Sequence, residues 1–151
     1  MNHISPLLSL DTVLLDLDFS SKKKLFEHTG DLFSRQLGLK SSDVFNSLFE
    51  RERLGSTALG YGIAIPHGRI KGLAKATGAF YRLKTPLEFD APDAQPVTLC
   101  CVLLVPKEAN DEHLQILGEL AHLFGDETMR ARMKNADSAT ELHALIDSWV
   151  A

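Results

Sequence analysis

Apolar side chains recur every three or four residues in the first third of the chain and predict two amphipathic helices there. Ser20 and Ser21 are candidate N-caps for the first helix, and Gly38 can end it. The second helix is expected to begin near residues 41–42 and to end at Gly55. The two apolar stripes consist of Leu25, Phe26, Leu32, Phe33 and Leu37, and of Val44, Phe45, Leu48 and Phe49.

The middle of the chain changes to patterns that are typical of strands. Residues 63–66 predict a short strand that ends at its proline, since proline cannot donate to a ladder. Residues 77–83 and 87–89 predict two further strands, with a Thr-Pro pair between them. Residues 97–105 form an almost unbroken apolar run rich in β-formers, which is typical of a central strand buried on both faces.

Three more helices are predicted after this buried strand, over about 111–124, 127–134 and 139–150, with Asn110 as the N-cap of the first. The chain thus runs from helices through strands to helices around one buried strand. This order predicts an α/β fold, a single-domain sandwich in which a mixed β-sheet is flanked by helices on both faces.

The length of the chain predicts one globular domain, and its charge argues against binding to nucleic acid. The chain has 151 residues, which is the size of a single domain, and we expect 1–151 to be that domain. Residues 1–20 are expected to be a lead-in segment, of which 13–17 form either a short strand or a helical turn. The 16 Lys and Arg residues against 20 Asp and Glu residues argue against a dedicated nucleic-acid partner.

The two cysteines, Cys100 and Cys101, are adjacent in the apolar run. Neighbouring strand residues point to opposite faces, so a mutual disulfide would be strained and buried thiols in a reducing cytoplasm are expected. We expect neither a signal peptide nor insertion into a membrane, because no basic segment precedes a long apolar stretch and no apolar run reaches the length of a span.

Several familiar sites are excluded by their missing motifs. No phosphate loop of the G-x-x-x-x-G-K-[ST] type, no G-x-S-x-G elbow and no zinc motif is present. Gly60 and Gly62 begin like a dinucleotide fingerprint, but Ile65 stands where its third glycine belongs. We therefore expect neither a cofactor nor a metal.

The most informative stretch is rich in glycine and ends at Gly68. It holds four glycines in fourteen residues, which marks a backbone that turns tightly or approaches another group closely. Ile63 and Ile65 alternate on one strand face, and His67 is next in phase after Pro66. The histidine is thus expected at a strand end, and Gly68 leaves room where a large group would reach the ring.

A second histidine, His113, is expected in the first turn of a helix. On a helical wheel it lies within the apolar stripe of Leu117, Leu120 and Phe124, whereas His122 falls on the opposite, exposed side. A helix N-terminus carries partial positive charge and unpaired N–H groups, and both favour an anion.

From the residues alone, His67 can be either a core histidine or a functional one. Imidazole suits a covalent phosphoryl carrier, because one ring nitrogen attacks while a hydrogen bond to the other holds the tautomer. Phosphoryl transfer also needs donors around the phosphoryl oxygens. Candidates for binding the phosphoryl group are His113, Arg51, Ser56, Thr57 and Gly68.

The residues around these histidines resemble the phosphorylation-site signature of the fructose/mannitol-type IIA proteins of the bacterial phosphotransferase system. The similar stretches are residues 51–57, 59–60, 63–68, 83–91, 96–97 and 112–114. The chain is most similar to the nitrogen-regulatory IIA branch, in which the domain stands alone without a fused sugar-transport part.

This resemblance implies that His67 accepts a phosphoryl group from phosphohistidine on HPr or its paralogue NPr. It also implies that His113 supports the phosphoryl group and that Arg51 stabilises it. The phosphorylated and free forms would then bind regulatory targets such as sensor kinases or potassium-transport proteins. Two alternatives stay open: a sugar-specific IIA component that passes phosphate from His67 to a cysteine of a IIB domain, and a phosphate-independent binding domain.

Two residues depart from the pattern of that family. Tyr61 stands where a small polar residue is usual, and Ala58 stands where glycine is frequent. Neither position contributes an obvious catalytic group, so we expect Tyr61 to affect the choice of partner rather than phosphorylation.

Overall fold

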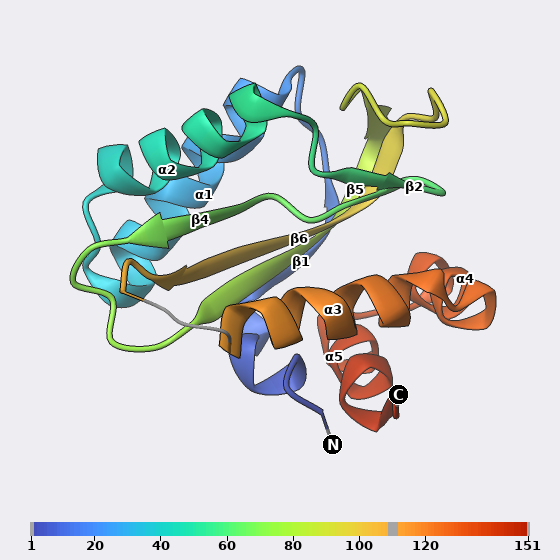
Figure 1. Ribbon diagram of the computed structural model, residues 1–151. Coiled ribbons are helices and arrows are strands. Elements are labelled where there is room, and N and C mark those ends of the chain that lie inside the picture. The colour runs from blue at the N-terminus through green and yellow to red at the C-terminus, as the bar shows by residue number, and fades with distance from the viewer. Residues whose placement is uncertain (1, 109–111, 151) are drawn as a thin grey trace.

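One open, mixed sheet organises the molecule, with helices on both of its faces (Figure 1). The computed structural model describes residues 2–108 and 112–150, and these form six strands and five α-helices. The strands are β1 (Val13–Leu17), β2 (Ala58–Gly60), β3 (Ile63–Ala64), β4 (His67–Ile70), β5 (Thr77–Leu87) and β6 (Val97–Pro106). The helices are α1 (Lys22–Leu37), α2 (Ser41–Leu54), α3 (Glu112–Gly125), α4 (Glu127–Asn135) and α5 (Ala139–Ser148).

The sheet has the order β1-β5-β6-β3-β2, and β4 also pairs with β6. β5 and β6 are antiparallel, whereas β1 is parallel to β5, and β3 and β4 are parallel to β6. Helices α1 and α2 cover one face, and α3, α4 and α5 cover the other (Figure 1). The predicted α/β sandwich with a mixed sheet is confirmed.

Strand β6 is buried on both faces, as its apolar run predicted. Leu99, Cys101, Leu103 and Val105 face the core under α3–α5, and the residues between them face the core under α1 and α2. Both cysteines are free thiols, and burial raises the pKa of Cys101 to about 12. Two neutral thiols therefore act as small core residues.

The strand predicted over 63–66 does not end the pairing at Pro66. Strand β4 resumes directly after it, so β3 and β4 follow the same edge of β6. The expectation was wrong because proline lacks only the N–H group, and its carbonyl still accepts a hydrogen bond from the Leu103 N–H at 2.9 Å. His67 consequently begins a strand instead of ending one, opposite Leu103.

The strands predicted over 77–83 and 87–89 are one strand, β5, and residues 88–89 lie outside it. Its pairing with β6 shifts register between Arg82 and Leu87, and Leu87 then lies opposite Val97. Pro86 falls in this irregular stretch, where a missing N–H costs no regular ladder hydrogen bond. The proline is therefore tolerated within the strand.

The helix boundaries largely follow the predicted signals. Ser21 caps α1 by accepting a hydrogen bond from the Lys24 N–H, and Gly38 ends it at φ 69°. For α2, the N-cap is Lys40, without a side-chain cap. The N-cap predicted at Asn110 lies outside the described residues.

The predicted lead-in contributes to the sheet. Its residues 13–17 form the strand β1, which pairs in parallel with β5 through Val13 and Phe80. Two short 3₁₀ turns, Ser5–Leu7 and Leu10–Thr12, precede it. Among the described residues, no helix combines the length and the apolar content that a membrane crossing requires.

Candidate functional site

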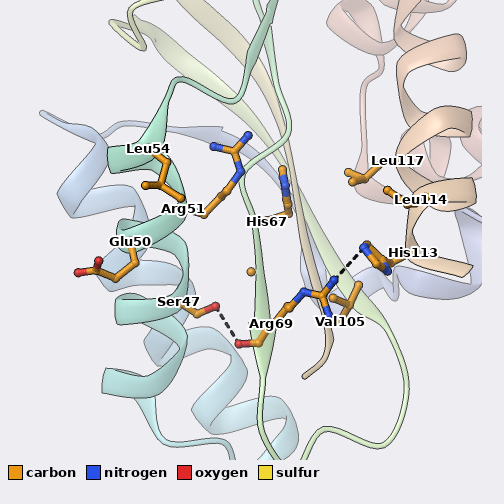
Figure 2. A pocket seen from close by; sticks show the side chains of 11 residues that line it. Ser47, Glu50, Arg51, Leu54, His67, Arg69, Val105, His113, Leu114 and Leu117 are labelled. Carbon is orange, nitrogen blue, oxygen red and sulfur yellow. Dashed lines mark hydrogen bonds between the residues drawn. The ribbon is translucent and has the colours of Figure 1, made fainter. Parts of the chain in front are cut away.

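A cavity of about 440 Å³ lies between α2 and α3 and exposes the start of β4 (Figure 2). Its polar and charged lining residues are Ser47, Glu50, Arg51, His67, Arg69 and His113. Its apolar side chains are Leu54, Val105, Leu114 and Leu117. The structure thus brings together the three residues that the sequence placed at the centre of the chemistry, although they are up to 62 positions apart.

His67 lies half-buried on the face of the sheet that α3 covers, in phase with Ile63 and Ile65 as predicted. Its Nδ1 lies 2.9 Å from the Ile65 carbonyl oxygen. Because a carbonyl can only accept, Nδ1 carries the proton of this bond. In the neutral ring Nε2 then holds a lone pair, which makes it the nucleophilic atom.

The surroundings of His67 favour this neutral form. Burial lowers the pKa of His67 below its ordinary value of 6.5, and the positive charge of Arg51 lowers it further. The hydrogen bond to the Ile65 carbonyl acts in the opposite direction without outweighing burial. At neutral pH the ring is therefore mostly unprotonated and able to attack an electrophile.

We expect His67 to titrate with a midpoint below pH 6.5, and Arg51→Ala to raise that midpoint because it removes a cation that disfavours the imidazolium. Ring-proton NMR titration measures both midpoints. Arg53→Ala is the matched control, because Arg53 is exposed on the same helix and pairs with Glu50 at 2.8 Å. An unchanged or lower midpoint in Arg51→Ala would contradict the electrostatic assignment.

Arg51 belongs to the last turn of α2. Its Nη1 donates to the Gly55 carbonyl oxygen at 2.8 Å, which fixes the guanidinium over the end of the helix. The carbonyl ends of a helix favour a cation. Arg51 thereby presents a positively charged donor to the cavity (Figure 2).

His113 faces the cavity from the first turn of α3, and its Nε2 lies 3.2 Å from Nη2 of Arg69 (Figure 2). His122, on the same helix, is exposed as predicted. Sequence reasoning did not single out Arg69. The signal was available, because Arg69 lies two residues after His67 and so shares its strand face.

The hydroxyls of Ser56 and Thr57, in the loop that follows α2, donate to acceptors on either side of this loop. Ser56 Oγ donates to the Phe89 carbonyl, and Thr57 Oγ1 donates to the carboxylate of buried Glu52. Glu52 also accepts from Lys22 Nζ at 3.2 Å. The described residues that line the cavity include neither hydroxyl, so their role in binding a phosphoryl group stays a prediction.

Gly68 does line the cavity, but its small size serves contact with α2. A Cβ atom at this position would lie 2.2 Å from Ser47 Oγ. Ser47 in turn donates to the Arg69 carbonyl at 2.9 Å and ties α2 to β4. The glycine therefore lets the strand approach the helix, which is a different reason from the room around the ring that the sequence suggested.

Tyr61 lies away from this cavity, at the tip of the turn between β2 and β3. It has φ 57°, between two glycines that also have positive φ, and its N–H donates to Asp93 at 2.9 Å. The guanidinium of Arg130 lies 4.6 Å from the centre of its ring. With 66% of the residue exposed, Tyr61 can affect a partner's contact with the surface.

The arrangement is suited to accepting an anionic electrophile. A neutral imidazole with a free Nε2 lone pair faces a cavity that also holds two guanidinium groups and the N-terminal turn of a helix. Among the described residues, no group of three or more His, Cys, Asp or Glu side chains is placed to hold a metal ion. The site thus combines a nucleophile with cationic donors.

Comparison with known proteins shows the family to which the chain belongs. The family model for the phosphoenolpyruvate-dependent sugar phosphotransferase system, EIIA 2, matches residues 6–149. A nitrogen regulatory protein of Klebsiella oxytoca is 40% identical over 145 residues, 95% of this chain and 90% of that protein.

Two solved structures share the fold. The nitrogen regulatory protein IIA-Ntr of Neisseria meningitidis superposes with a TM-score of 0.91 at 47% identity, covering 96% of this chain and 99% of that one. IIA-Mtl of Escherichia coli, solved in complex with phosphorylated IIB-Mtl, has a TM-score of 0.78 at 20% identity, covering 94% and 98%. The chain therefore belongs to the EIIA 2 family of the phosphoenolpyruvate-dependent sugar phosphotransferase system.

Proposed function

We propose that the chain is a cytoplasmic phosphoryl-carrier protein with a regulatory role, formed by a single IIA domain. His67 accepts a phosphoryl group from phosphohistidine on HPr or NPr, and phosphorylation decides which targets the protein binds. The hydrogen bond between His67 Nδ1 and the Ile65 carbonyl carries this proposal, because it leaves Nε2 as the attacking atom in a cationic cavity. The similarity to nitrogen regulatory proteins supports the regulatory part.

In the proposed transfer, the lone pair of His67 Nε2 attacks the phosphorus of the donor's phosphohistidine. A new P–N bond forms while the donor's P–N bond breaks, and its electron pair stays on the donor nitrogen. The proton on His67 Nδ1 remains bound to the Ile65 carbonyl, which stabilises the positive charge that develops on the ring. Arg51 and His113 line the same cavity and are the proposed donors to the phosphoryl oxygens.

The regulatory consequence follows from charge. A phosphorylated hydroxyl carries about −1.5 to −2 charges at neutral pH, and phosphohistidine changes a surface in a similar way. The exposed leucines Leu54 and Leu114 line the cavity, so this charge would arise beside apolar side chains that a partner can contact. Targets such as sensor kinases or potassium-transport proteins could thereby distinguish the two forms.

The second candidate function is sugar transport, in which His67 passes its phosphoryl group to a cysteine of a IIB domain. The IIA-Mtl structure, with the same fold, was solved with phosphorylated IIB-Mtl, and this observation favours the candidate. The phosphoryl site would be the same in both functions, so only the acceptor distinguishes them.

The test is phosphorylation of the intact chain by phosphoenolpyruvate, the first enzyme of the relay and HPr or NPr. We expect a label that is labile to acid and stable to alkali, as phosphohistidine is, and no transfer from the labelled chain to purified IIB domains. Rapid transfer to a IIB domain would support the transport function instead. No label, with a known IIA protein as positive control, would favour a phosphate-independent binding domain.

A further inference from the structure

Arg69 shares the strand face of His67 and lies in the same cavity (Figure 2). In β4, Ile70 belongs to the core on the α1/α2 side, so the odd-numbered positions face α3. The separation of two residues along an extended strand places their Cα atoms about 6.6 Å apart. Arg69 is therefore the next residue after His67 on this face of β4, and both side chains line the cavity.

The guanidinium of Arg69 links two other parts of the site. Nη1 donates to the Lys107 carbonyl oxygen at 3.0 Å, just after β6 ends, and Nη2 lies 3.2 Å from Nε2 of His113. The first contact holds the guanidinium against the end of the sheet. The second contact brings the guanidinium to the first turn of α3, where it meets His113, the residue predicted to support the phosphoryl group.

The contact between Arg69 and His113 restricts the proton of the imidazole. A guanidinium carries only donors, so the ring nitrogen opposite Nη2 must accept. His113 Nε2 therefore holds a lone pair, and the proton of the neutral ring is on Nδ1. This is the same tautomer that the Ile65 carbonyl imposes on His67. Which nitrogen is protonated decides in which direction the ring can donate.

We propose that Arg69 is a positioning residue that holds His113 as the Nδ1–H tautomer in a fixed orientation beside His67. The tautomer follows from the contact itself, whereas its importance for phosphoryl transfer rests on the proposed function. Outer partners of metal-binding histidines typically change affinity or activity about 10- to 100-fold when they are removed, and we expect an effect at the lower end of this range here.

The direct test reads the tautomer of His113 from the ¹⁵N chemical shifts of its ring in the full chain. Spectra are recorded about two pH units above 6.5, the ordinary pKa of a histidine, so that neutral rings dominate. We expect the wild type to show a protonated Nδ1 and an unprotonated Nε2. In Arg69→Ala we expect the Nε2–H form, which neutral histidine prefers in water, to become the major one. Arg69→Lys should retain Nδ1–H, because lysine also only donates.

The matched control is Lys71→Ala, which removes an exposed cation two residues further along the chain. It should leave the His113 tautomer unchanged. A wild-type His113 with its proton on Nε2 would overturn the proposal, and this result does not depend on whether any variant folds. A tautomer that is the same in the wild type and in Arg69→Ala would overturn it as well.

The rate of phosphorylation of His67 shows whether the His113 tautomer affects phosphoryl transfer. Phosphorylation of His67 by the HPr-type carrier should slow about tenfold in Arg69→Ala and remain close to wild type in Lys71→Ala. An unchanged rate in Arg69→Ala would remove the catalytic consequence. If the wild type takes no phosphate at all, the proposed function fails, while the ring spectra still decide whether Arg69 sets the tautomer.

Discussion

The variant His67→Ala is expected to lose all phosphorylation by the HPr-type carrier, because it removes the atom to which the phosphoryl group would bind. Loss of a nucleophile cannot be compensated by the remaining cations of the cavity, which only stabilise charge. Transfer is measured as label that is labile to acid and stable to alkali. In the wild type, NMR of the phosphorylated ring should place the phosphoryl group on Nε2, since Nδ1 is bound to the Ile65 carbonyl.

The control for this experiment is His122→Ala. His122 is exposed on α3, where its ring contacts Trp149. The substitution His122→Ala should therefore leave labelling of the chain unchanged. Equal labelling of the wild type and His67→Ala would place the acceptor elsewhere. A phosphoryl group on Nδ1 would contradict the tautomer assignment while leaving His67 as the acceptor.

The largest expected effect on stability comes from Gly68→Ala. The added Cβ would lie 2.2 Å from Ser47 Oγ and 3.1 Å from the Ser47 carbonyl carbon, so the backbones of β4 and α2 must separate. Overpacking of this kind costs about 1–3 kcal/mol, and we expect a loss of about 3 kcal/mol because backbone is involved. Chemical denaturation, with the free energy of unfolding compared at equal m-value, measures the loss.

A matched glycine separates crowding from the general effect of a methyl group. A Cβ at Gly118 in α3 would meet nothing within 4 Å, and Gly118→Ala should stabilise the protein by about 0.5–1 kcal/mol. Combining Gly68→Ala with Ser47→Gly should recover part of the loss, so the two sites would be coupled in a double-mutant cycle. Additive effects, or a stable Gly68→Ala variant, would show that the contact with α2 does not require the glycine.

The elements that local sequence patterns specify agree with the structure, whereas those that depend on contacts between distant segments do not. Periodicity predicted α1 and α2, and the apolar run predicted β6, because these signals are local and the core confirms them on both faces. The sequence also predicted that His67 and Ile63 share one face of the sheet, because the alternation of side chains along a strand does not depend on the neighbouring strands.

The failures occurred where pairing decides the outcome. Pro66 was predicted to end a strand, but its carbonyl still accepts a hydrogen bond from β6. The Thr-Pro pair at 85–86 was predicted to separate two strands, but a register shift accommodates Pro86 within β5. The hydroxyls of Ser56 and Thr57 donate to the Phe89 carbonyl and to the Glu52 carboxylate, and their contact with a phosphoryl group stays a prediction. For Pro66, the hydrogen-bond partner comes from β6, a segment whose position the local pattern does not encode.

By itself, the sequence determined the class of the fold, the family resemblance and the candidate nucleophile, because these depend on local periodicity and on residue types at fixed spacing. Only the tertiary structure decided which nitrogen of His67 is protonated and that Arg69 contacts His113. It also decided that Gly68 serves the contact with α2. The physical reason is that tautomers and close approaches depend on the atom opposite. The backbone conformation before β4 supplies the Ile65 carbonyl, and packing of β4 between α2 and α3 supplies Ser47 and His113.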